Sequence, residues 1–306
     1  MALMRKLAAV ALAAAALGGA GFWALTRPAT LPAETLAALQ AHEADAEAGA
    51  RVFWAAGCAG CHAAPGLTGM DPVEDRLVLS GGRRLESDFG TFVAPNISPH
   101  PVAGIGGWSL EDFARATLLG VSPDGRHYYP SFPYTSYIRM TPGDLADLWA
   151  FWQDLPADDT PSASHELGFP FTLRRGLGLW KALHLDPGFV TDVAAEAERT
   201  ELERGRYLSE ALAHCGECHT PRGLTGGLDA ARWMAGAPNP SGRGRIPALP
   251  PEGWTEQQIA LYLGSGFTPE FDLVGGSMAD VVEHMKQLPD TDHQAIAAYL
   301  MALEGR

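Results

Sequence analysis

Two copies of one short pattern, Cys-x-x-Cys-His, use every cysteine in the chain. Residues three apart on a helix share a face, so two thiols at this spacing can add to the two vinyl groups of one haem. The histidine that follows is then held under the iron as an axial ligand. The sequence therefore predicts two covalently bound haem c groups, with attachment residues Cys58, Cys61, Cys215 and Cys218 and axial ligands His62 and His219.

Three other uses of a Cys-x-x-Cys pair explain the sequence less well. A dithiol redox site needs no second copy with the same trailing histidine. A zinc site built from both pairs would join distant cysteines and leave the two histidines without a role. A disulfide that closes only two intervening residues is strained. Haem attachment accounts for both cysteines and the histidine of each pattern.

The first 28 residues differ from the rest of the chain. Arg5 and Lys6 precede an uncharged run from Leu7 to Leu25, which as a helix would span roughly 28 Å, close to the thickness of a bilayer core. Because apolar residues continue to the end of the run, we expect a membrane anchor; a cleaved signal is the alternative, since Gly18-Gly19-Ala20 resembles a cleavage site. The basic end stays inside, so the remainder is exported. This predicts the periplasmic face of a bacterial inner membrane, or the periplasm after cleavage.

The charge of the chain bears on its partners. The 306 residues carry a net charge of −14, which disfavours a nucleic-acid partner because nucleic acid needs basic contacts. Acidity of this kind usually gives solubility, and it can also steer a protein toward a basic partner surface.

An internal repeat extends beyond the cysteine patterns. Gly107-Trp108-Ser109 resembles Gly253-Trp254-Thr255, and Ser109 and Thr255 have the character of helix N-caps. A glycine, Gly49 or Gly205, lies in the helical stretch before each cysteine pattern and would allow another helix to cross closely, although simple tolerance of glycine also explains it. An internal duplication explains these coincidences.

This repeat predicts the fold. We expect an all-α protein with two tandem class I cytochrome c-type domains, each around one haem, behind an N-terminal transmembrane helix. The predicted domains cover residues 43–156 and 201–306. The connecting segment, 157–200, carries several large apolar side chains, which predicts that it packs across both domains rather than acting as a floppy linker.

The sixth ligand of each iron is predicted from the methionines. Met278 follows Gly275-Gly276-Ser277 in a loop before the last helix, where a thioether can reach the iron of the second haem. Read without gaps, the repeat places Phe132 at the matching position of the first half, and phenylalanine cannot ligate iron. Met140, eight residues later, is our prediction for the first haem; Met70 and His127 are alternatives, and Met140 could instead serve in packing.

Several longer segments carry a resemblance to a known family. The chain resembles the cytochrome c subunits of membrane-bound bacterial alcohol and gluconate dehydrogenases in residues 89–99, 104–109, 123–127, 132–137, 215–222 and 275–278. The resemblance covers essentially the whole exported part. It implies an electron-transfer subunit at the periplasmic face whose donor is a periplasmic or membrane-bound dehydrogenase. The acceptor would be another cytochrome, an oxidase or a quinone-linked protein. Family members of the alcohol dehydrogenase type often carry three haems, whereas this chain has motifs for two, and the family often has methionine in place of Phe132.

These observations predict a two-haem c-type cytochrome that carries electrons and has no catalytic residue of its own. The alternative is a two-haem enzyme, such as a peroxidase or a sulfur-compound oxidase, in which one iron has an open or displaceable ligand position.

Overall fold

The structure, a computed structural model, describes residues 1–67, 71–192, 200–240 and 244–303 and is mainly helical. Its longer helices are α1 (Ala2–Leu25), α2 (Ala33–Ala41), α3 (Ala46–Ala55), α5 (Leu110–Leu119), α7 (Pro142–Gln153), α8 (Leu177–His184), α9 (Thr200–Tyr207), α11 (Glu256–Ser265), α12 (Ser277–Met285) and α13 (Asp290–Met301). Shorter helical segments are α4 (Cys58–His62), η1 (Val73–Leu77), α6 (Tyr134–Tyr137), η2 (Arg174–Gly176), the π-helical turn η3 (Leu208–Leu212), α10 (Gly216–His219) and η4 (Ala230–Arg232).

Within the described ranges, five short strands accompany the helices, and the sequence did not predict them. An antiparallel sheet has the order β1-β2-β3, and a second pair joins β4 and β5. The strands are β1 (Arg84–Ser87), β2 (Gly90–Val93), β3 (Glu166–Leu167), β4 (Ala237–Pro238) and β5 (Arg245–Ile246). Because β3 belongs to the connecting segment, the sheet attaches that segment to the first half of the chain.

Each half contains a pair of helices that cross at a glycine. At Gly49, where α3 meets α7, an added Cβ would lie 2.0 Å from the backbone oxygen of Asp147. At Gly205, where α9 meets α13, an added Cβ would lie 1.8 Å from the backbone oxygen of Ala295. Real Cβ atoms do not approach so closely, which confirms the prediction that both glycines allow a close helix crossing.

The helix that follows each tryptophan has the same ends in both halves. Ser109 and Thr255 each form a capping box with the residue three positions later, which confirms both predicted N-caps. Gly120 and Gly266 end the two helices in the left-handed conformation, at φ 58° and 81°. The repeated sequence therefore folds into the same local structure twice.

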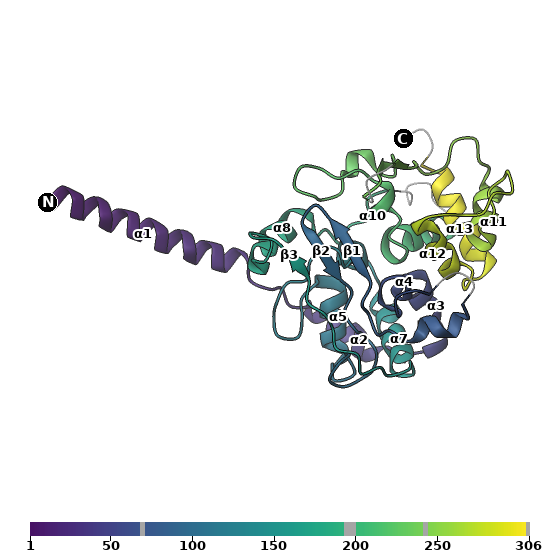
Figure 1. Cartoon of the computed structure of the whole chain (residues 1–306), viewed down its shortest axis with the longest axis horizontal. Coiled ribbons are helices and arrows are strands. Elements are labelled where there is room, and N and C mark those ends of the chain that lie inside the picture. The colour runs from purple at the N-terminus through teal and green to yellow at the C-terminus, as the bar shows by residue number, and fades with distance from the viewer. Residues whose placement is uncertain (68–70, 193–199, 241–243, 304–306) are drawn as a thin grey trace.

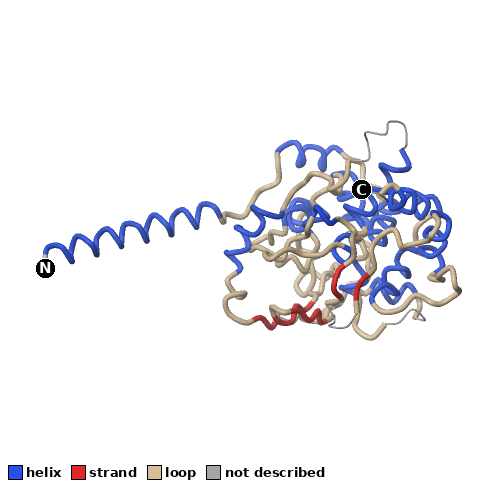
Figure 2. The backbone as a smooth tube through the Cα atoms, turned by 90° about the horizontal axis from the view of Figure 1, so that it is seen from above, coloured by secondary structure: helices blue, strands red, loops and turns tan. Residues whose placement is uncertain are grey.

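The two halves share one hydrophobic core, and α1 stays outside it. Buried residues of α3, α7, α9, α11 and α13 belong to a single cluster. Figure 1 shows α1 projecting from the compact body, with α8 and β3 beside its base and α11, α12 and α13 on the opposite side. The tube in Figure 2 shows the same projection from above. Within the described residues, α1 is the one helix long and apolar enough to cross a membrane.

The connecting segment contacts both halves, mainly through polar groups. The Lys181 ammonium donates to the carbonyls of Leu119 and Gly120, both at 2.6 Å, where α5 ends. On the other side, the Trp180 indole donates to the carbonyl of Thr225 at 2.9 Å. The segment therefore contacts both halves through these hydrogen bonds, whereas several of its large apolar side chains are exposed.

Candidate functional site

Both Cys-x-x-Cys-His patterns form a short helix that turns away from the helix before it. In the first half, Gly57 adopts a positive φ of 65° between α3 and α4. In the second, His214 takes a φ of 42°, which is uncommon for a residue with a side chain. The positive φ values redirect the chain, so each pattern begins a new helical turn of its own.

The two histidines of the patterns have matching hydrogen bonds. His62 Nδ1 lies 2.9 Å from the carbonyl oxygen of Pro95, and His219 Nδ1 lies 2.8 Å from that of Pro247. A carbonyl oxygen can only accept, so in both rings Nδ1 carries the proton and Nε2 keeps a lone pair for a metal. Burial lowers the pKa of both histidines, which favours the neutral, ligating form. These two residues fit the iron ligands of haem c.

The thiols of the two patterns do not have the properties of a redox dithiol. Burial raises the pKa of Cys58 and of Cys215 to about 12. A reactive dithiol instead needs a thiol whose pKa is lowered. Within the part of the chain that the structure describes, no group of three or more His, Cys, Asp or Glu side chains is placed to hold a metal ion.

The predicted sixth ligands lie at different depths. Met278 is partly buried at the first turn of α12 and packs against the hydrophobic core. Met140 is 4 % exposed and belongs to that core. Of the two alternatives, Met70 lies outside the described residues. His127 Nε2 lies 3.0 Å from the carbonyl oxygen of Thr26, at the base of α1. His127 therefore already has a partner at its Nε2.

The register of the repeat changes by two residues before the last helix. Tyr128 donates its N–H to the Gly120 carbonyl as Val274 does to that of Gly266, which keeps the gapless register of the sequence. Further on, Met140 donates to the Tyr137 carbonyl as Leu288 does to that of Met285. The structural counterpart of Met140 is therefore Leu288, a buried core residue, and not Met278.

The two helices of the Cys-x-x-Cys-His patterns, α4 and α10, are called the attachment helices after their predicted role, and contacts across the boundary between the halves bring them near each other. The Tyr137 hydroxyl donates to the carbonyl of Ala56, two residues before Cys58, at 2.7 Å. The same tyrosine ring lies 5.7 Å from the ring of His214, the residue before Cys215. A second contact joins the halves directly, because Thr135 Oγ1 donates to Glu217 Oε1, inside the second pattern, at 2.8 Å.

The thiol pKa values agree with this proximity. Burial is the main cause of the raised pKa of Cys218, and Glu217 and Cys61 raise it further. Cys61 belongs to the other pattern, so these two cysteines lie near each other in the fold. The structure thus brings together two segments that are far apart in the sequence.

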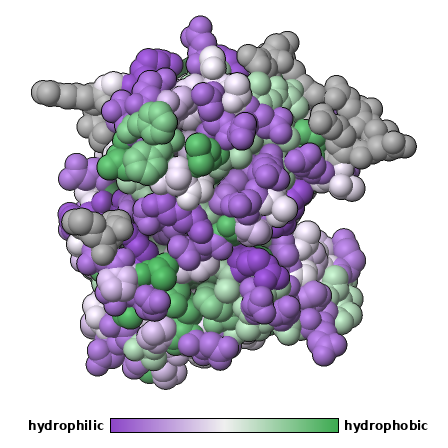
Figure 3. All heavy atoms as spheres, turned by 90° about the vertical axis from the view of Figure 1, so that its right-hand side faces the viewer, coloured by the Kyte–Doolittle hydropathy of each residue, from purple (hydrophilic) through white to green (hydrophobic). Residues whose placement is uncertain are grey.

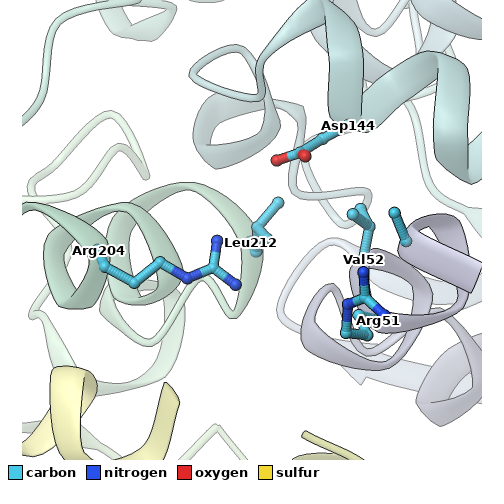
Figure 4. A pocket seen from close by; sticks show the side chains of 6 residues that line it. Arg51, Val52, Asp144, Arg204 and Leu212 are labelled. Carbon is cyan, nitrogen blue, oxygen red and sulfur yellow. The ribbon is translucent and has the colours of Figure 1, made fainter. Parts of the chain in front are cut away.

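One cavity borders the first attachment helix, and a smaller one lies elsewhere between the halves. One of about 520 Å³ lies beside the first attachment helix, where Ala59, Gly60 and Ala63 line it together with Arg76, Arg83 and Asp280. The other, of about 170 Å³, lies at the boundary between the halves. Figure 4 shows Arg204 and Leu212 on one side of it, Arg51 and Val52 on the other, and Asp144 between them. Arg204 forms an ion pair with Asp292 at 2.8 Å. The smaller cavity is a space between the two halves, and no residue of either attachment helix lines it.

Sequence reasoning missed the partners of the histidines and the residues between the patterns. Pro95 and Pro247 act through backbone carbonyls, 33 and 28 residues after their histidines. Every residue has such a carbonyl, so no residue type marked these positions. Tyr137 and His214 were visible as aromatic residues, but only the packing of the two halves gives them a shared role.

Known proteins resemble this chain over most of its length. The family model for cytochrome c matches residues 46–156. A protein described as "Diheme cytochrome c-type" from Cereibacter sphaeroides is 54% identical over 92% of this chain and 93% of its own length. The fructose dehydrogenase cytochrome subunit of Gluconobacter japonicus is 36% identical over 87% of this chain and 54% of its own. For the alcohol dehydrogenase (quinone) cytochrome c subunit of Gluconobacter oxydans, the identity is 31% over 92% of this chain and 60% of its own. The chain thus spans nearly all of the first relative and little more than half of the other two.

Proposed function

Because this chain belongs to the family of dihaem c-type cytochromes and dehydrogenase cytochrome c subunits, we propose that it is a two-haem cytochrome that carries electrons from a dehydrogenase toward the respiratory chain. The observation that carries the proposal is the matching pair of histidines. In each, a backbone carbonyl fixes the proton on Nδ1 and leaves Nε2 for iron. Two such sites in one chain suit a relay better than a single reaction centre.

The residues of each site have distinct roles in this proposal. Cys58 and Cys61 hold the first haem covalently, and Cys215 and Cys218 hold the second. Bound haem c supplies an iron that exchanges one electron at a time. The halves 43–156 and 201–306 then form two cytochrome c-type domains, and the segment 157–200 connects them. The closely matched helix crossings at Gly49 and Gly205 support this division.

The contact between the halves supports transfer from one site to the other. Tyr137 touches the backbone before the first pattern and the histidine before the second. It is 5 % exposed, so this contact between the two patterns is largely shielded from water. A short connection between the two sites is what a carrier with two redox centres requires.

The location of the protein follows from α1. We propose that α1 is an uncleaved anchor in the inner membrane and that the two domains face the periplasm. The residue after the helix, Thr26, is fully buried against the body, which supports a helix that stays attached. The dehydrogenase donor and a cytochrome, oxidase or quinone-linked acceptor would then meet the chain at the membrane.

Substitution of each predicted sulfur ligand by leucine tests the sixth ligands. Leucine keeps most of the volume of methionine but cannot ligate iron. Met278→Leu is expected to remove the near-infrared sulfur-to-iron band of one haem and to lower the potential of that haem alone, because a thioether favours ferrous iron. Met140→Leu is expected to do the same to the other haem.

The counterpart of Met140 is Leu288, so leucine should be tolerated there as a packing residue, and a spectral change would report ligation. If Met140→Leu leaves both haem spectra unchanged, Met140 serves in packing. His127→Gln is the matched comparison. A switch of one haem to high spin in that variant alone would assign the ligand to His127, and binding of carbon monoxide by the unmutated ferrous protein would favour the enzyme alternative.

The proposed function is tested in membranes that contain the chain. Fructose and ethanol are added in turn under anaerobic conditions, because two of the relatives are cytochrome subunits of a fructose dehydrogenase and an alcohol dehydrogenase. With one of them, we expect the absorbance of reduced haem c to appear, and to be missing from membranes of a strain that lacks the chain. Haems that no dehydrogenase substrate reduces, together with turnover of hydrogen peroxide, would overturn the proposal in favour of a peroxidase.

A further inference from the structure

The connecting segment exposes a group of large apolar side chains. Phe169 is 81 % exposed, Leu173 61 % and Leu183 71 %, and Phe171 and Leu179 are exposed as well. Leu179 and Leu183 are four residues apart on α8 and therefore share one face of that helix. The opposite face turns inward, where Gly178 and Lys181 are buried. We refer to these five exposed residues as the apolar surface. Large apolar side chains exposed together within one segment are typical of an interaction site.

The apolar surface is joined to the base of α1 by direct contacts. Arg175, between Leu173 and Leu179, donates from Nε to Thr26 Oγ1 at 2.8 Å and from Nη2 to the Trp23 carbonyl at 2.7 Å. Its guanidinium also lies 3.9 Å from the centre of the Trp23 ring. At Gly178 a Cβ would be 2.7 Å from the Thr26 Cα, so α8 and the end of α1 are in close contact. The segment that carries the apolar surface is therefore attached directly to the end of α1, and Figure 1 shows α8 beside the base of that helix.

The charge of this segment also differs from that of the rest of the chain. Residues 167–185 contain no aspartate or glutamate and have three basic residues, although the whole chain carries 36 acidic ones. Arg174 is stacked 4.5 Å over the ring of Tyr129, and Lys181 lies 4.5 Å from the ring of Tyr134, so both point back to the body. The side that remains outward is apolar and lacks the negative charge that would repel anionic lipid. Figure 3 shows the face on the far side from α1, where polar side chains predominate and hydrophobic ones are scattered.

We propose that the apolar surface lies in the interfacial layer of the same bilayer that α1 crosses, so that the body rests on the membrane instead of swinging on a single helix. The inference rests on the membrane location proposed above. It commits to lipid because the surface lies next to a helix of membrane-spanning length and composition and because the segment that carries it, residues 167–185, has no aspartate or glutamate. Apolar side chains in this layer contact acyl chains a few ångströms below the headgroups. Lying on the membrane would fix the height of both attachment helices above the bilayer.

The test uses the full-length, haem-loaded protein in lipid nanodiscs that contain phosphatidylglycerol and a phospholipid with a photoactivatable group in its upper acyl chain. After illumination, labelled peptides are mapped by mass spectrometry. Label is expected on α1 and on residues 169–183, with labelling of the apolar surface on the order of tenfold above that of Phe271 and Leu273, since interfacial side chains contact acyl chains directly. Those two residues are the matched control, because they are 84 % and 71 % exposed but lie in the loop before α12.

A double variant, Leu179→Glu with Leu183→Glu, should lose most of the label on residues 169–183 while the label on α1 persists. Its haem absorbance spectrum must equal that of the unmutated protein, which shows that the body is folded. Label confined to α1 would overturn the inference and leave the anchor intact. Label on neither would overturn the anchor as well. If residues 169–183 become cross-linked to a dehydrogenase in native membranes and not to lipid, the surface binds a protein and the inference fails.

Discussion

Replacement of both cysteines of the first pattern, Cys58→Ala together with Cys61→Ala, is expected to leave a chain that carries one covalent haem instead of two. In the proposed assignment both thiols form thioether bonds to the same haem, so their joint loss would remove every covalent link at that site. His62, the proposed iron ligand, is untouched, and any haem it still held would dissociate on denaturation. The measurement is the intact mass of the denatured protein, together with a haem-stained denaturing gel.

The matched variant replaces both cysteines of the second pattern by alanine, Cys215→Ala with Cys218→Ala, and should lose one haem in the same way. Combining all four substitutions should give a colourless band. An unmutated protein whose mass contains no haem, or a double variant that still retains two, would contradict the assignment of the attachment residues. The result does not depend on knowing the electron donor or acceptor.

The second large effect is expected at a helix crossing. Gly205→Ala should lower the free energy of unfolding by about 3 kcal/mol, since overpacking a tight contact has costs of this size. The added Cβ would lie 1.8 Å from the backbone oxygen of Ala295, and a backbone cannot move aside as a flexible side chain can. Alanine normally stabilises a helix relative to glycine by about 1 kcal/mol, so a loss of stability would reverse the usual trend. The free energy of unfolding is measured by guanidinium unfolding of the haem-loaded protein, monitored by far-ultraviolet circular dichroism.

Two further substitutions control for this effect. Gly49→Ala should behave like Gly205→Ala, because its Cβ would lie 2.0 Å from the backbone oxygen of Asp147 in the other half. Gly168→Ala has no atom within 4 Å of the added Cβ, and its stability should stay within about 0.5 kcal/mol of the unmutated protein. Equal stability of all three variants would show that α9 and α13 do not cross as closely as described.

The sequence by itself predicted the features that depend on neighbours in the chain. A Cys-x-x-Cys-His pattern carries its attachment chemistry within five residues, and a serine or threonine N-cap bonds an amide three residues away. Ser109 and Thr255 were therefore identified correctly, as was the repeat to which they belong. The glycines at the helix crossings were also visible, because only glycine lacks the Cβ that such a contact would exclude.

The tertiary structure alone decided which distant groups meet. The carbonyl that fixes His62 lies 33 residues away, and a carbonyl has no sequence signature because every residue has one. The position of Tyr137 between the two patterns depends on how the halves pack. The correspondence of Met140 to Leu288 in the repeat depends on a two-residue change in register. The apolar residues of the connecting segment appear in the sequence as candidates for burial. Their exposure beside α1 is a property of the folded surface. Hydrophobicity favours removal of a side chain from water, but the fold determines whether another part of the chain covers it.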